Sequence, residues 1–175
     1  MVPLLLQSSG KILSAGGVVF SDGSAWEYGR GEAVLEAPQS YVRPADYGSA
    51  YCMMAPRELF VALGLFAAEY SPAWYDDTDA AFAVRAAGFE VYYTPFAEAV
   101  VLETQDLVIT KGHMTKAQLL EANRNTFQRK WASVLSCHYL HDTVASQANS
   151  FCLRKDGLSL SLNSETYFLT IEGHL

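Results

Sequence analysis

The chain has 175 residues, half of them hydrophobic and 18% charged, so it can form one ordinary domain with a buried core and is neither disordered nor fibrous. Twelve basic side chains stand against nineteen acidic ones. The resulting formal charge of −7 has the wrong sign for a protein that neutralises a phosphate backbone. The composition therefore argues against nucleic acid as a partner.

The sequence predicts no membrane-spanning or secretory segment. Its first residues lack a basic group before a short apolar run, unlike a signal peptide. The longest apolar run, residues 59–68, is about half of the roughly 20 residues that a spanning helix needs. Cys52, Cys137 and Cys152 form an odd set without C-x-x-C spacing, which suits a reducing compartment. We expect a cytoplasmic protein, in solution or peripheral at a membrane.

The first half of the chain alternates short apolar runs with turn residues. Residues 12–20 predict a strand that ends in a turn at residues 21–24, and residues 47–54 predict a largely buried strand. Pro56 begins a helix over residues 56–63, because its missing N–H is harmless in the first turn, and Gly64 is placed to end it.

The second half repeats this alternation. A helix is expected over residues 77–87, where side-chain oxygens can cap the first N–H groups, and it closes at Gly88. Residues 89–94 predict a strand stopped by Pro95, and residues 99–102 predict another.

A third helix, residues 115–131, opens with the capping-box spacing of Thr115 and Gln118. Together these elements predict an α/β fold in which a mixed sheet is flanked by helices. The tail, residues 132–175, is rich in serine, and leucines that alternate with polar residues at 158–162 indicate a terminal β-hairpin with residues 167–171 as the partner strand.

The segment richest in candidate functional side chains is residues 70–96, where aromatic residues lie on both sides of Asp76, Asp77 and Asp79 in the sequence. Aromatic faces stack on sugar rings, and a carboxylate in a partly apolar cleft can accept a proton from a hydroxyl. The alternative interpretation is that these carboxylates only cap the helix that starts here.

Two metal-like patterns carry little weight. Asp77 and Asp79 form an Asp-x-Asp sequence, but it opens a helix and does not follow a nucleotide-binding strand. His138 and His141 lack both the i, i+4 spacing and the adjoining glutamate of a helical zinc motif. The identity of any metal ligand stays unknown at this point.

Four segments, in this order, resemble family 2 glycosyltransferases of the GT-A fold. They are GGVVFSDGSAWEYGRGE (16–32), YVRPADYGSAYCMMAPRELF (41–60), YSPAWYDDTDAAFAVRAAGFEVYYTP (70–95) and ANRNTFQRKW (122–131). The resemblance covers residues 12–131, which it identifies as a partial glycosyltransferase domain, and it leaves residues 132–175 unmatched.

The resemblance implies that a sugar is transferred from a nucleotide-sugar to an acceptor hydroxyl, with inversion at the anomeric carbon. It assigns the catalytic base to Asp77 and a supporting role to Asp76. It also implies that the acceptor is bound by Gly48, Ser49, Trp74 and Tyr75.

The nucleotide-binding half of such enzymes, with its divalent Mn or Mg, would precede Gly16 and is expected to be missing here. A nucleotide-sugar would then bind only if another chain supplied that half. The acceptor, a glycan or a lipid-linked molecule, would bind to the present chain. Two alternatives remain open, a noncatalytic carbohydrate-binding or interaction module and an inactive truncated homologue.

Overall fold

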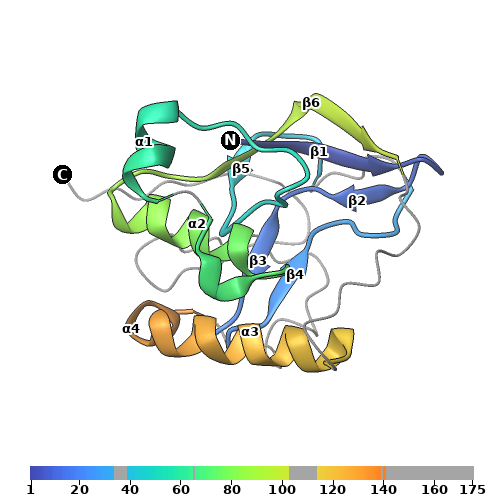
Figure 1. Cartoon of the computed structure of the whole chain (residues 1–175). Coiled ribbons are helices and arrows are strands. Elements are labelled where there is room, and N and C mark those ends of the chain that lie inside the picture. The colour runs from blue at the N-terminus through green and yellow to red at the C-terminus, as the bar shows by residue number, and fades with distance from the viewer. Residues whose placement is uncertain (34–38, 65, 103–113, 139, 141–175) are drawn as a thin grey trace.

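The computed structural model describes residues 1–33, 39–64, 66–102, 114–138 and 140, which form the predicted mixed α/β fold (Figure 1). The strands are β1 (Val2–Gln7), β2 (Ile12–Ser14), β3 (Gly17–Val19), β4 (Ala25–Glu27), β5 (Arg43–Pro44) and β6 (Tyr92–Val101). The helices are α1 (Arg57–Ala62), α2 (Asp76–Ala86), α3 (Lys116–Lys130) and α4 (Ala132–Leu135), with a 3₁₀ turn, η2, over Ala68–Tyr70. No helix in these ranges is both long enough and apolar enough to cross a membrane.

The strands form two sheets. In the larger one, with the order β2-β1-β6-β5, β1 runs parallel to β6 and antiparallel to β2, and β5 is antiparallel to β6. In the smaller one, β3 and β4 form a hairpin whose turn is held by the carboxylate of Asp22, which accepts the backbone N–H and the hydroxyl of Ser24. The side chains of Leu4 and Leu5 on β1 are fully buried, so this strand, which was not predicted from the sequence, lies at the centre of the fold.

The strand predicted over residues 12–20 is wrong as a single element. It consists of β2 and β3, which belong to different sheets. Gly16 separates them with a φ of +79°, a left-handed conformation that glycine adopts without steric cost and that turns the chain from one sheet into the other.

The strand predicted over residues 47–54 is also wrong. Only Tyr47 pairs with a strand, in an isolated antiparallel bridge with Gly17, and the chain then turns at residues 49–52, where the N–H of Cys52 donates to the carbonyl of Ser49. Gly48 packs so closely on β1 that a Cβ there would lie 2.2 Å from Cγ1 of Val2. The buried apolar character of this segment therefore reflects packing without strand pairing.

The two strands predicted at residues 89–94 and 99–102 are one strand, β6, which runs through Pro95. The register with β1 shifts at this point, since Pro3 pairs with Thr94 but Leu4 pairs with Glu98. This irregularity leaves Pro95 out of the ladder, which explains how a residue without an N–H fits inside the strand.

The three predicted helices are confirmed within one or two residues at each end. Gly64 and Gly88 follow α1 and α2 with positive φ, and the capping box at the start of α3 is formed in both directions by Thr115 and Gln118. The predicted terminal hairpin lies outside the described residues.

Helix α2 lies between α1 and α3 (Figure 1). Its Phe82 ring is 4.8 Å from the ring of Phe127 on α3 and 5.5 Å from that of Trp131, centroid to centroid, so these aromatic rings join the two helices in the core.

The approach to α2 depends on one buried amide. The Nδ2 group of Asn123 on α3 lies within hydrogen-bond distance of the carbonyl oxygens of Tyr70 (2.9 Å), Ala73 (2.8 Å) and Trp74 (3.1 Å). These contacts hold the segment from η2 to α2, in which Trp74 and Tyr75 both have positive φ.

We predict that Asn123→Ala lowers the free energy of unfolding by about 2–4 kcal/mol, because the carbonyls of Tyr70, Ala73 and Trp74 lose their donor. Asn125→Ala, on the exposed side of the same helix, is the matched control and should change it by less than about 0.5 kcal/mol. Urea denaturation of both variants measures the difference, and equal effects would contradict the role given to Asn123.

Candidate functional site

The site forms where the first turn of α2 meets the turn that follows Tyr47. Asp76 and Asp77 open the helix, and residues 48–50 lie opposite. The contact between the two segments is a hydrogen bond of 3.1 Å from the backbone N–H of Ala50 to Oδ2 of Asp77. Residues 27 positions apart in the sequence are thereby held at one place.

The carboxylate of Asp77 is a strong candidate for proton transfer. Its other oxygen, Oδ1, accepts the N–H and the hydroxyl of Thr78, at 2.7 and 3.2 Å. Burial raises the pKa of Asp77 from 3.8 to about 6, the charge of Asp76 adds to this shift, and the hydrogen bonds from Ala50 and Thr78 oppose it. A carboxylate whose pKa lies near neutrality is suited to act as a general base.

Asp79 has a different role, although it belongs to the same acidic run. It is buried and accepts hydrogen bonds from the hydroxyl of Tyr70 (3.0 Å), Nε1 of Trp131 (2.7 Å) and Nζ of Lys130 (2.8 Å). Burial and the charge of Asp79 raise the pKa of the Tyr70 hydroxyl. Asp79 therefore ties α2 to η2 and to the end of α3.

The capping alternative holds only in part. The N-cap residue of α2 is Tyr75, and its side chain makes no capping hydrogen bond. The contact of Asp77 with the N–H of Thr78 does satisfy one donor of the first turn, and all three carboxylates lie at the end of the helix where the dipole favours negative charge.

The four residues that the resemblance assigns to the acceptor lie in different surroundings. Gly48 is packed on Val2, and Ser49 beside it is buried. Tyr75 is buried against Phe127, with its hydroxyl donating to the carbonyl of Gly23 at 2.9 Å, so it faces the hairpin. Trp74 is half-buried, and its ring lies 5.5 Å from the ammonium group of Lys116.

A buried ion pair beside the site was not predicted. Oδ1 of Asp46 lies 3.0 Å from NH1 of Arg85 on α2, and its Oδ2 accepts the N–H of Val19. This pair fixes the chain immediately before Gly48 to the helix that carries Asp77. The only signal in the sequence is the position of Asp46 within the motif of residues 41–60, and nothing there indicates Arg85 as its partner.

The described residues do not fit a divalent metal. No three histidine, cysteine, aspartate or glutamate side chains among them are close enough together to hold one. Asp77 and Asp79 face different partners, so the Asp-x-Asp pattern does not form a paired site. Nδ1 of His138 lies 2.7 Å from the carbonyl of Val19, and His141 lies outside the described residues.

A cavity of about 120 Å³ adjoins Asp77. Asp77 forms part of its wall, together with the start of β1, residues 53–56, α1 and one face of α2. This cavity was not predicted from the sequence, because β1, whose first residues form one of its walls, was not recognised as a strand.

No protein-family model, no curated protein and no solved structure matches this chain. The resemblance to glycosyltransferases thus rests on the four sequence segments.

We predict that stability falls as the pH rises from about 4 to about 7 through the contribution of Asp77. The pKa of Asp77 is 3.8 in the unfolded chain and about 6 in the folded chain, so between pH 3.8 and about pH 6 the folded state binds more protons than the unfolded state. The stabilisation is therefore fully present below pH 3.8 and is lost as the pH rises through 6. The shift corresponds to about 3 kcal/mol.

Asp77→Asn, which cannot ionise, tests this contribution. Urea denaturation of both proteins between pH 3 and pH 8 should show the variant gaining about 3 kcal/mol relative to the natural chain over that range. The values at pH 3, where Asp77 is largely protonated in both the folded and the unfolded chain, provide the internal control. A stability difference that is independent of pH would show that Asp77 titrates normally.

Proposed function

We propose that this chain is the acceptor-activating half of an inverting glycosyltransferase with a partial GT-A fold. The observation that carries the proposal is the hydrogen bond between Ala50 and Asp77. The resemblance assigns one site to two separate motifs, and this bond brings those motifs into contact at a carboxylate whose pKa suits proton transfer. The mixed α/β fold is consistent with this assignment.

Asp77 acts as the general base in this proposal. The oxygen of the acceptor hydroxyl attacks the anomeric carbon, its proton passes to the carboxylate of Asp77, and the bond from that carbon to the nucleotide diphosphate breaks with its electron pair. Inversion follows from this single displacement. Asp76 supports the base, since its negative charge favours protonation of Asp77.

The remaining groups hold Asp77 in place. The N–H of Ala50 and the donors of Thr78 fix the orientation of its carboxylate, and the pair of Asp46 and Arg85 fixes the segment that carries Ala50. Positioning of this kind supports catalysis because the reacting atoms must meet within a narrow range of geometry. Since the described residues do not fit a metal, no step is assigned to one.

We predict that Asp77→Asn lowers transfer about 10²- to 10⁴-fold, the usual contribution of a general base. Transfer of a radiolabelled sugar from a panel of nucleotide-sugars is measured with the purified full chain, alone and with an extract of its source cells to supply a donor-binding partner. Glu58→Gln, which removes one exposed carboxylate on α1, is the charge-matched control and should leave transfer unchanged.

Two results would count against this function. Full transfer by Asp77→Asn would exclude Asp77 as the base. Absence of transfer under every condition, with the chain folded, would favour the noncatalytic binding module or the inactive homologue.

We also predict that the chain alone binds nucleotide-sugars more weakly than about 1 mM, because the site is acidic and the net charge is negative, so a diphosphate is repelled. Calorimetric titration with several nucleotide-sugars, with and without manganese, measures this affinity. Micromolar binding would reveal a phosphate site within this chain.

A further inference from the structure

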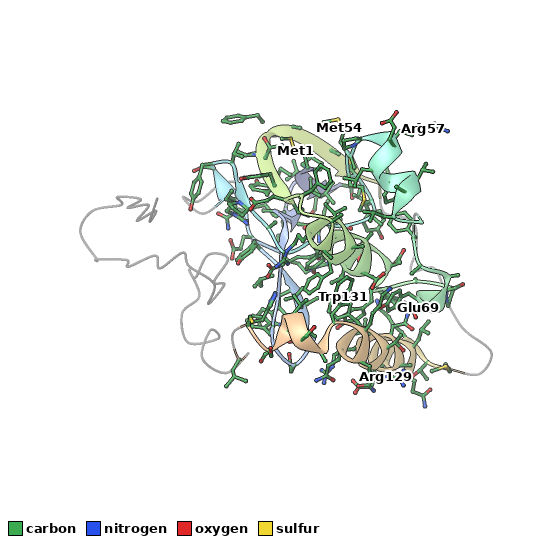
Figure 2. All side chains as sticks on the ribbon, turned by 90° about the vertical axis from the view of Figure 1, so that its left-hand side faces the viewer. Met1, Met54, Arg57, Glu69, Arg129 and Trp131 are labelled. Atoms are coloured by element: carbon green, nitrogen blue, oxygen red, sulfur yellow. The ribbon has the colours of Figure 1, made fainter. Side chains whose placement is uncertain are left out.

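The cavity beside Asp77 lies under α1, at the end of the molecule opposite α3. Figure 2 shows Met1, Met54 and Arg57 together at this end, with Arg129 of α3 at the other. Met1 and Met54 are joined by two backbone hydrogen bonds, of 2.8 and 2.9 Å, so the wall that they form is fixed by the main chain.

Most of the cavity wall is apolar. Its apolar lining includes Val2, Met53, Leu59, Phe60, Val84 and Val91. Helix α1 has no fully buried residue, and its inward side chains, Leu59 and Phe60, are only half-buried above the cavity. The volume of about 120 Å³ approaches that of an engineered apolar cavity of about 150 Å³ that binds benzene. The space therefore suits one aromatic ring or a branched alkyl group of similar size.

The charged side chains in the cavity wall are both acidic. Asp77 and the exposed Glu90 are the carboxylates, none of the lining side chains is basic, and the one cation in the wall, the terminal ammonium group of Met1, donates a hydrogen bond to the carbonyl of Met54. A hydroxyl next to an apolar group could donate a hydrogen bond to Asp77. A polyhydroxylated sugar ring placed here would turn the hydroxyl groups on its inner side against methionine and leucine side chains, which cannot pair with them.

We infer that the cavity binds the apolar part of the acceptor, an aryl ring or a branched alkyl unit of about five or six carbons, whose attached hydroxyl meets Asp77. The inference rests on the proposed function for the role of that hydroxyl. It narrows the acceptor from any glycan or lipid-linked molecule to an amphipathic alcohol whose apolar end enters the protein first.

The test uses benzyl alcohol as the probe and the full chain. Amide resonances are followed by two-dimensional NMR during titration, with glycerol as the polar control. Benzyl alcohol should shift the amides of Ala50 and Val84 with a dissociation constant on the order of 1 mM, while Gly10 and Gly31 stay unchanged. Glycerol at the same concentrations should shift none of them.

Three variants locate the binding. Ala81 lines the cavity, so Ala81→Leu should fill it and weaken benzyl alcohol binding about tenfold or more. Ala86→Leu is the matched control, because Ala86 is exposed on the same helix, and it should change binding less than about twofold. Leu59→Ala enlarges the cavity and should shift the preference from benzyl alcohol toward 2-naphthylmethanol. If Ala81→Leu does not fold, the preference of Leu59→Ala between the two alcohols tests the inference instead.

Several results would overturn the inference. They are the absence of shifts with benzyl alcohol, equal effects of Ala81→Leu and Ala86→Leu, and no change of preference in Leu59→Ala. The failure of the proposed function would look different, because Asp77→Asn keeps the volume of the side chain and should still bind benzyl alcohol. If Asp77→Asn binds benzyl alcohol and also retains full transfer, Asp77 is excluded as the base, while the assignment of the cavity stands.

Discussion

The position of the candidate site depends on the side-chain amide of Asn123. Two consecutive residues before α2, Trp74 and Tyr75, have positive φ, a conformation that bulky residues rarely adopt and that costs roughly 1–3 kcal/mol each. Such a turn persists only where its surroundings stabilise it, and the three carbonyl contacts of Asn123 do so. Helix α3 thereby determines where α2 begins and which way Asp77 faces.

The acidic run at the start of α2 shows how one short sequence serves two purposes. Asp79 has an ammonium group, an indole N–H and a hydroxyl around it, so its charge is compensated and contributes to packing. Asp77 accepts hydrogen bonds from Ala50 and Thr78, no cation among the described residues pairs with it, and burial makes its charged form unfavourable. A neutral residue at position 77 would avoid this desolvation cost, and a buried carboxylate with a raised pKa is suited to the catalytic role that we propose for it.

The helices could be predicted from signals within a few residues, whereas the strands were difficult to predict because they depend on pairing between distant segments. The capping box of Thr115 and the glycines after α1 and α2 act within a few residues, so the sequence alone places these ends. The strand could not be predicted to continue through Pro95, because the proline is tolerated only through a register shift against the neighbouring strand β1, which is distant in the sequence. The same limit applied to the site: the run around Asp77 was recognisable, but its contact with Ala50 and the pairing of Asp46 with Arg85 join residues that are 27 and 39 positions apart.

The cavity wall contains Met1, Met53 and Met54, and this choice of side chain has a chemical consequence. An unbranched thioether has several rotatable bonds and a polarisable sulfur, so a wall of this kind can adjust to rings and branched chains of different outline. The same sulfur atoms are open to oxidants, above all that of Met54, which is 69% exposed. Conversion to the sulfoxide would place a polar group at an apolar wall, so peroxide would close this site to apolar molecules until a reductase restored the thioether.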